Sequence, residues 1–224
     1  MNVPMYDVKD ISLAPSGMKK IEWAYNNMPV LRAIEAELIK EQPFKGLKIS
    51  VSVHVEAKTA CLARALARGG ADVALTGCNP LSTQDDVAAA LASTGMHVYT
   101  IHGDNEEEYV NHLKMALCFG PDIVIDDGGD FAMLLHSEMS DLVPNLLGGC
   151  EETTTGVHRL EILEKEGKLL LIGDGMNGDF LRLVKVDKII EELEEFDFVP
   201  LNMPSGVLSQ ELISQMSELY KEYN

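Results

Sequence analysis

The sequence predicts an α/β fold: a single doubly wound, mostly parallel sheet with helices on both faces, in three layers. Short apolar runs rich in β-branched residues alternate with amphipathic stretches of helical length almost to the C-terminus. Strands that alternate with helices in this way are typical of parallel sheets. The length of 224 residues suits one such domain with at most a small appendage, and 46% hydrophobic residues provide a substantial core.

Six segments have the pattern of strands: Leu47–Val53, Ala71–Thr76, His97–Ile101, Asp122–Ile125, Lys168–Ile172 and Phe196–Leu201. Seven segments between and around them have the pattern of helices: Met18–Glu41, Lys58–Arg68, Thr83–Ala92, Glu106–Cys118, Thr154–Lys165, Asp187–Glu194 and Ser209–Tyr220. Ser82 and Asp85 have the spacing of a capping box, with Asp in place of Glu, so we expect a helix to begin after Ser82.

The composition narrows the classes of partner. The formal net charge of −18 would repel nucleic acids and anionic membranes, so we expect neither, although a small anionic or zwitterionic ligand stays possible inside a cleft. No apolar run approaches the roughly 20 residues of a membrane span, and the N-terminus has no signal-peptide pattern. The four cysteines are far apart without a CxxC pair, which predicts free thiols in the cytoplasm.

Polar and titratable residues follow nearly every predicted strand. Ligands of such sheets bind outside the carboxyl ends of the strands, so this edge is the expected cleft. The residues concerned are His54, Glu56, Cys78, Asn79, His102, Asp126, Asp127, Asp130 and Asp174. Loops are polar in any protein, but the recurrence after successive strands favours a functional site.

Besides the loop of Cys78 and Asn79, whose side chains could touch a ligand, three segments carry chemistry. His54, followed by Glu56 and Lys58, could supply a proton shuttle, or it could be a satisfied polar group at a strand end. Asp126–Asp130 holds three carboxylates and two glycines; clustered carboxylates repel and normally bind a metal, sugar hydroxyls or a positive side chain. Oxygen ligands would suit Mg²⁺ or Ca²⁺, but hydroxyl recognition fits equally well, and we predict no metal site. Glu151–Thr155 opens a helix whose N–H groups and hydroxyls would face a ligand.

These segments, taken with two others, resemble the substrate-binding domain of the S-adenosylhomocysteine hydrolase (adenosylhomocysteinase) family. The matching stretches are DISLAPSGMKKIEWAYNNMPVLR (Asp10–Arg32), VHVEAKTA (Val53–Ala60), GCNPLSTQDDVAAAL (Gly77–Leu91), IDDGGD (Ile125–Asp130) and EETTTGV (Glu151–Val157). STQDD and EETTTG in this order and spacing are highly specific. The resemblance extends from Asp7 to Gly167, and VEAKTA resembles the bacterial and archaeal branch.

The resemblance implies cleavage of the thioether of S-adenosylhomocysteine, or of a related nucleoside thioether, by a cycle in which NAD oxidises and then reduces the ribose. It implies catalytic roles for His54, Asp127 and Glu152. Glu56 and Lys58 would lie near the nucleobase, which could be adenine or hypoxanthine. The implied substrate-binding residues are, in full, Glu56, Lys58, Thr59, Cys78, Asn79 and Asp130. Thr153, Thr154 and Thr155 would contact NAD, provided that another chain supplies it.

The resemblance ends near Gly167, so we expect residues 1–167 to form the substrate-binding domain and residues 168–224 to complete it as a divergent segment. The family's catalytic lysine has no counterpart there. Gly173–Gly178 formally matches GxGxxG, but Asp174 and Asp179 would put negative charge beside a pyrophosphate, and the tail has too few strands for a dinucleotide half-fold. We therefore expect no cofactor bound by this chain alone.

Three functions remain open. The chain could be an enzyme on a nucleoside thioether that obtains NAD from a partner chain. It could be a non-redox enzyme on a similar ligand, with His54, Asp127 and Glu152 as acid and base groups. It could also be a module that binds adenosyl compounds. A homo-oligomer or a pair with a chain carrying an NAD domain is the expected assembly.

Overall fold

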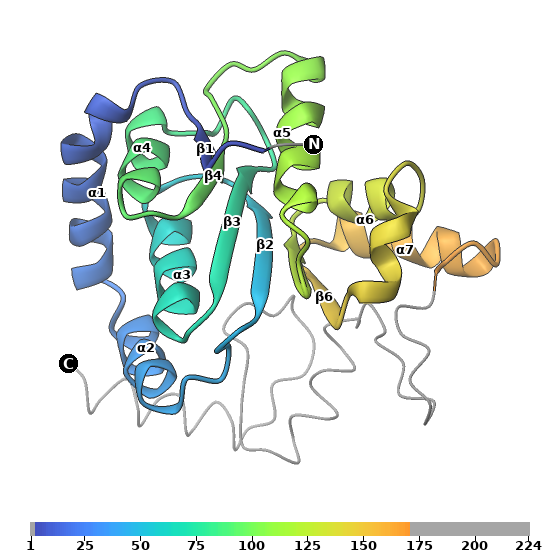
Figure 1. Cartoon of the computed structure of the whole chain (residues 1–224), viewed down its shortest axis with the longest axis horizontal. Helices are drawn as coiled ribbons and strands as arrows, with labels where there is room; N and C mark the ends of the chain where they lie inside the picture. The colour runs from blue at the N-terminus through green and yellow to red at the C-terminus, as the bar shows by residue number, and fades with distance from the viewer. Residues whose placement is uncertain (1–2, 171–224) are drawn as a thin grey trace. The chain divides into compact units, whose positions relative to one another are not determined.

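The computed structural model describes residues 3–170, which form a six-stranded sheet covered by helices (Figure 1). The strands are β1 (Tyr6–Asp7), β2 (Lys48–Val53), β3 (Asp72–Gly77), β4 (His97–Tyr99), β5 (Ile123–Asp126) and β6 (Gly148–Glu151). They lie in the order β1-β4-β3-β2-β5-β6, and each neighbouring pair is parallel. The predicted parallel α/β sheet is confirmed.

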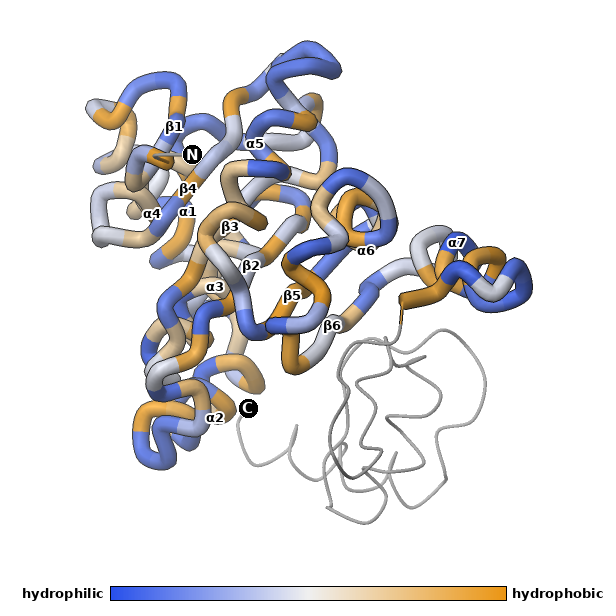
Figure 2. Tube along the Cα trace, turned by 45° about the vertical axis from the view of Figure 1, so that its right-hand side comes forward, coloured by the Kyte–Doolittle hydropathy of each residue, from blue (hydrophilic) through white to orange (hydrophobic). Residues whose placement is uncertain are grey.

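The helices cover both faces of the sheet. They are α1 (Ala14–Asn26), α2 (Pro29–Glu41), α3 (Ala57–Arg68), α4 (Asp85–Ser93), α5 (Glu106–Cys118), α6 (Asp130–Leu135) and α7 (Thr154–Lys165), with short 3₁₀ helices η1 (Ile11–Leu13) and η2 (Ser140–Asn145). Val73 and Leu75 of β3 pack into a core with α1, α3 and α4, whereas Ala74 between them packs with α5 and α6. Side chains alternate across a strand, so both faces of β3 are apolar. The tube is also hydrophobic along β5 (Figure 2). Ile123 and Ile125 of this strand pack against the first core, and Val124 packs into the second.

The strand order changes direction at β2. From β2 it continues to β3 and β4 on one side, and it then returns to β5 and β6 on the other side. β2 therefore pairs with β3 along its whole length and with β5 over Ile49–Val51. Such a switch point opens a crevice at the carboxyl ends of the strands, which is where open α/β sheets bind ligands. The segments that follow β2, β3 and β5 meet there.

Most predicted elements lie where the sequence indicates them. The four strands expected before residue 130 are confirmed as β2 to β5, with ends displaced by one or two residues. The helices predicted over Glu106–Cys118 and Thr154–Lys165 match α5 and α7 at both ends. Each of these two helices has a side-chain cap, Asn105 and Thr153 respectively.

Two helix predictions are wrong in detail. The single helix expected over Met18–Glu41 is two helices, because Pro29 has no N–H to continue α1 and instead occupies the first turn of α2. The capping box expected at Ser82 and Asp85 does not form. Helix α4 begins at Asp85 after Gln84, whose side chain makes no capping hydrogen bond.

The short strands β1 and β6, the short helix α6 and the 3₁₀ helices η1 and η2 were not predicted. Residues 168–170, the start of an expected strand, are not in a strand. The remaining expectations lie outside the described residues: the rest of that strand, the strand Phe196–Leu201, the helices Asp187–Glu194 and Ser209–Tyr220, Asp174, and the glycine-rich stretch Gly173–Gly178. Within residues 3–170 no helix combines the length and the apolar character needed to cross a membrane.

Candidate functional site

His54 is the first residue after the central strand β2, and its side chain is 49% exposed at the switch point. Its Nδ1 lies 2.6 Å from Oγ of Ser82, and that hydroxyl donates its only hydrogen to the carbonyl of Asn79 at 2.8 Å. Ser82 can therefore only accept from the ring, so Nδ1 carries a hydrogen. In the neutral ring the lone pair is then on Nε2, which lies 3.7 Å from Oδ2 of Asp127.

Cys78 follows β3, and its thiol donates a hydrogen bond to Oδ2 of Asp127 at 3.2 Å. Burial, together with the neighbouring carboxylate of Asp127, raises the pKa of this thiol above its ordinary value. The sulfur is therefore protonated at neutral pH, and it serves as a hydrogen-bond donor to the carboxylate rather than as a ready nucleophile.

Asp127 follows β5 and receives both contacts on one oxygen. The backbone then turns sharply through Gly128 and Gly129, whose φ angles of 98° and 84° are in the left-handed region that glycine favours. This turn leads directly into α6. Two glycines are needed here because the chain must leave β5, present Asp127 and enter the helix within three residues.

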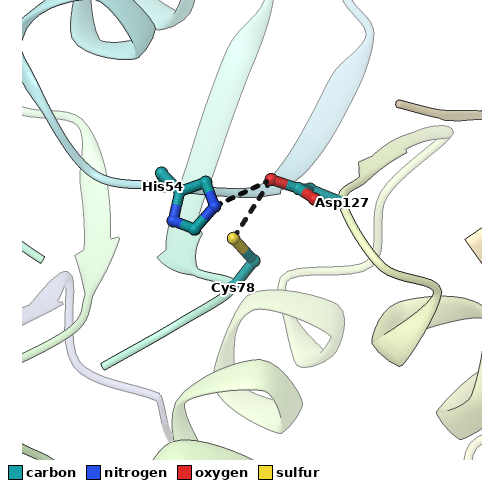
Figure 3. A group of neighbouring side chains, drawn as sticks. All are labelled: His54, Cys78 and Asp127. Carbon is teal, nitrogen blue, oxygen red and sulfur yellow. Dashed lines mark hydrogen bonds and ion pairs between the residues drawn. The ribbon is translucent and has the colours of Figure 1, made fainter. Parts of the chain in front are cut away.

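The three side chains converge although each comes from a different strand. Figure 3 shows His54 and Cys78 both directed at the carboxylate of Asp127. One ligand-type atom from each residue lies within 4.8 Å of the other two. Sequence reasoning placed all three at the same edge, and the structure brings them into contact.

A buried glutamate, Glu151, holds the two loops that border this group together. Its Oε1 accepts from the backbone N–H of Gly128 at 2.9 Å, the N–H of Thr153 at 2.9 Å and the hydroxyl of Thr153 at 2.6 Å. The carboxyl group fits against Gly156 so closely that a Cβ there would lie 2.2 Å from its Cδ. Glu151 thus fixes the loop carrying Asp127 relative to the loop carrying Glu152. Sequence reasoning did not assign this role.

Asp126 is the strand neighbour of Glu151 in the parallel pair β5–β6 and is 1% exposed. Burial raises the pKa of its carboxyl to about 7, and the nearby charge of Glu151 adds to the shift. Its Oδ2 accepts from the N–H of Ala132 at 2.9 Å, at the first turn of α6. Within residues 3–170 the other oxygen, Oδ1, has no hydrogen-bond partner, and the same is true of Oε2 of Glu151.

Glu152 lies at the end of β6 beside this group. Partial burial of its carboxyl and the negative charge of Asp127 raise its pKa, while His54 opposes the shift. Each of the three residues predicted as catalytic, His54, Asp127 and Glu152, directly follows a strand of the parallel sheet, so all three lie at the same edge.

The residues of the predicted nucleobase side have local structural partners. Glu56 caps α3: its Oε1 accepts from the N–H groups of Lys58 at 3.1 Å and Thr59 at 3.2 Å. The Thr59 hydroxyl donates to the carbonyl of His54, which fixes the backbone from which the imidazole projects. The ammonium group of Lys58 makes no hydrogen bond or ion pair within residues 3–170, and its side chain is exposed.

Asn79 and Asp130 also have partners. The side chain of Asn79 accepts from the N–H of Leu81 at 2.9 Å, which forms a tight local turn. Asp130 binds the hydroxyl of Tyr109 at 2.7 Å and the guanidinium of Arg159 at 2.8 Å. Its carboxylate thereby ties α6 to α5 and α7.

His102, the remaining residue of the predicted edge, is held by α4. Its Nδ1 lies 3.0 Å from the carbonyl of Thr83, and its N–H donates to Asp85. Within residues 3–170 it makes no hydrogen bond or ion pair with the group around Asp127.

The three threonines differ. Thr153 is the N-cap of α7, and its hydroxyl is used by Glu151 and Gly156. Thr154 and Thr155 are exposed at the helix N-terminus. Their hydroxyls and the positive end of the helix dipole could meet an anionic group. The contact of Thr154 and Thr155 with NAD stays a prediction, whereas Thr153 has a structural role.

Ser82 is a functional residue that the sequence pattern misassigned. Its hydroxyl fixes the tautomer and orientation of His54 instead of capping α4. The spacing to Asp85 gave a false signal. The pair Asn79-Pro80 before Ser82 is typical of turns and was the available sequence signal that Ser82 belongs to a loop.

The family model described as S-adenosyl-L-homocysteine hydrolase matches residues 5–145. The S-inosyl-L-homocysteine hydrolase of Methanocaldococcus jannaschii is 56% identical over 165 residues, which are 74% of this chain and 40% of the relative. The adenosylhomocysteinase of Pyrococcus abyssi is 48% identical over 177 residues, 79% of this chain and 42% of the relative. The adenosylhomocysteinase of Aquifex aeolicus is 52% identical over 165 residues, 73% of this chain and 40% of the relative. The matches thus cover about two fifths of the length of these relatives.

Proposed function

Because this chain belongs to the S-adenosyl-L-homocysteine hydrolase family, we propose that it binds a purine nucleoside thioether of homocysteine at the switch point and takes part in its cleavage. The observation that carries the proposal is the convergence of His54, Cys78 and Asp127 from β2, β3 and β5. Hydrolases for S-inosyl- and S-adenosyl-L-homocysteine are among its relatives, so these two thioethers are the candidate ligands.

The ribose would lie against Asp127 and Glu152. Carboxylate oxygens accept hydrogen bonds from sugar hydroxyls, and two carboxylates from adjacent loops suit a pair of neighbouring hydroxyls. In the free chain, burial and the negative charge of Asp127 raise the pKa of Glu152, and hydrogen bonds donated by the sugar hydroxyls would stabilise its ionised form.

His54 is placed to move a proton. Its Nε2 lies 3.7 Å from Oδ2 of Asp127 while Nδ1 is held by Ser82, so the ring can accept or release a proton at Nε2 without reorienting. This fits protonation of a departing sulfur and activation of an entering water. Burial keeps Cys78 protonated, so its part is to hold Asp127 in place.

We propose S-inosyl-L-homocysteine as the preferred ligand. Lys58 offers only hydrogen-bond donors, which match the O6 acceptor of hypoxanthine better than the amino group of adenine. The M. jannaschii relative, which shares 56% identity, is named for the inosyl compound. S-adenosyl-L-homocysteine is the second candidate, because the P. abyssi and A. aeolicus relatives are named adenosylhomocysteinase.

NAD would supply the hydride acceptor for oxidation of the ribose, a task that side chains cannot perform. We propose that Thr154 and Thr155 contact it and that its main binding site lies outside residues 3–170, in the same assembly. The two hydroxyls are exposed at the N-terminus of α7, which suits an anionic cofactor. The four cysteines are free thiols, which supports a location in the reducing cytoplasm.

The test is calorimetric titration of the full chain with S-inosyl- and S-adenosyl-L-homocysteine, followed by incubation with and without NAD and an assay for released thiol. Binding of at least one thioether is expected, with the inosyl compound tighter. Thiol release without NAD would favour a non-redox enzyme instead. Absence of binding to both compounds would refute the proposed function.

A further inference from the structure

His54, Cys78 and Asp127 bring three different donor atoms within 4.8 Å of one another (Figure 3). The donors are an imidazole nitrogen, a sulfur and a carboxylate oxygen. A ribose needs oxygen and nitrogen partners, but it has no use for a thiol. The combination of all three is instead typical of ligands for a borderline divalent metal ion.

We propose that His54, Cys78 and Asp127 bind one Zn²⁺ ion when no nucleoside is present, and that the bound ion excludes the nucleoside. In a tetrahedral zinc site with bonds of about 2.0 to 2.3 Å, neighbouring ligand atoms lie about 3.5 Å apart. The separations from Oδ2 of Asp127 are 3.2 Å to the sulfur of Cys78 and 3.7 Å to Nε2 of His54. Small side-chain rotations bring all three atoms into range.

The side chain of His54 already has the tautomer and the orientation of a metal ligand. Its Nδ1 hydrogen is donated to Ser82, whose own hydrogen is donated to the carbonyl of Asn79. This chain of hydrogen bonds fixes the tautomer that leaves the Nε2 lone pair free and aims it at Asp127. Zinc-binding histidines are held in this way through their second ring nitrogen.

The fourth position of the metal stays open to solvent. His54 is 49% exposed, whereas the side chain of Asp127 is 12% exposed, so the group has an open side and a closed side. Three protein ligands and one water form the arrangement of accessible zinc sites. Mg²⁺ and Ca²⁺ would not replace zinc here, because they prefer all-oxygen ligand sets.

Binding exchanges a proton for the metal. The S–H bond of Cys78 breaks, a Zn–S bond forms, and the proton leaves to solvent, with no change of oxidation state. Thiolate and carboxylate together then neutralise the dication. The sulfur ligand makes the site selective for metals with high affinity for sulfur.

The exclusion of nucleoside, though not the metal site itself, rests on the proposed function. The oxygen of Asp127 and the Nε2 of His54 that would hold zinc are the atoms that would face the ribose and the leaving sulfur. Both ligands cannot use them at once. The cleft would thus respond to free zinc as well as to its substrate.

The metal site is tested by titrating Zn²⁺ into the full chain in competition with a chromogenic chelator, and by spectroscopy with Co²⁺ as the probe. One ion per chain should bind, and Co²⁺ should give a thiolate charge-transfer band. His54→Gln and Cys78→Ser should each weaken zinc binding at least tenfold, and Ser82→Ala by about tenfold. Cys118→Ser is the matched control: Cys118 is exposed at the end of α5 and should not matter.

Unchanged zinc affinity in both His54→Gln and Cys78→Ser would overturn the site, as would displacement of Zn²⁺ by excess Mg²⁺. For the exclusion, saturating S-inosyl-L-homocysteine should raise the apparent Kd for zinc. If the thioether binds by calorimetry but leaves that Kd unchanged, the exclusion is wrong. If zinc binds but neither thioether does, the proposed function fails and the metal site stands.

Discussion

The thiol of Cys78 and the carboxylate of Asp127 are joined by a 3.2 Å hydrogen bond that connects the end of β3 to the end of β5. These strands are not neighbours in the sheet, because β2 lies between them. The bond therefore spans the end of β2, where His54 emerges. Of the residues at this point, His54 has a side chain that is 49% exposed and Asp127 one that is 12% exposed, so the side of His54 is the more accessible one.

Removing the charge of Asp127 should weaken nucleoside binding. Asp127→Asn keeps the size of the side chain but loses charge-assisted hydrogen bonds, each worth about 1.5 to 3 kcal/mol, so affinity should fall roughly tenfold to a hundredfold. Glu152→Gln should act in the same direction. Calorimetry with S-inosyl-L-homocysteine measures both, with Cys118→Ser as the control. Wild-type affinity in both carboxylate variants would discredit the ribose assignment.

Asp126 should make the fold less stable as the pH rises. Its folded pKa of about 7 lies above the unfolded value of 3.8, so between these values the folded chain binds a proton that the unfolded chain lacks. Stability from this group is complete below about pH 4 and is lost as the pH approaches 7, by on the order of 4 kcal/mol. Asp126→Asn should remove that loss.

Urea unfolding of wild type and Asp126→Asn from pH 4 to 8, in buffer with EDTA, measures this difference. The variant should gain relative stability as the pH rises. Asp141→Asn changes an exposed acid of η2 and should follow the wild type. If the stability difference between wild type and Asp126→Asn stays constant across this range, Asp126 titrates at the same pH in both states.

Gly156 and Glu151 should be energetically coupled. A Cβ at residue 156 would lie 2.2 Å from the Glu151 carboxyl carbon, so Gly156→Ala should cost about 1 to 3 kcal/mol and displace the Glu152 loop. In a Glu151→Ala background the clash is absent, and the same change should cost much less. A double-mutant cycle by urea unfolding gives the coupling. Strict additivity of the two changes would contradict the close fit.

Ser82→Ala should alter the tautomer of His54. Without the hydroxyl, Nδ1 loses its acceptor, and the fraction of rings with hydrogen on Nδ1 should fall. Long-range ¹H–¹⁵N NMR of the histidine side chains measures this fraction directly. His158, which is exposed on α7, should keep its spectrum. An unchanged His54 tautomer would mean that another group orients the ring.

The sequence predicts well those elements that carry their own signals. Helix α5 is marked at its start by Asn105 and Glu108, which form a reciprocal capping box, and both of its ends match the expectation. Strand β6 has no such signal: its sequence, GGCE, is poor in strand-forming residues, and it is a strand because it pairs with β5. Pro29 is a visible helix breaker within the N-terminal helical stretch, and it begins α2. The apolar periodicity continues across it, and this continuity favoured a single helix.

For the site, the sequence placed His54, Asp127 and Glu152 at one edge because each follows a strand. It did not reveal which partners each side chain has. Glu151 and Glu152 are adjacent and identical in type, yet Glu151 is 4% exposed and accepts hydrogen bonds from backbone N–H groups, whereas Glu152 is exposed. Glu151 is the last residue of β6 and Glu152 lies just outside it, so the difference depends on where this strand ends.

The three donors of the crevice sit on strands that are far apart in the chain. No segment shorter than residues 54–127 contains them all, so an incompletely assembled sheet offers a ligand only one or two at a time. Only molecules whose sheet is correctly assembled can therefore bind a ligand through all three donors. A ligand that recognises all three should also act as a folding stabiliser, raising the melting temperature with the logarithm of its concentration.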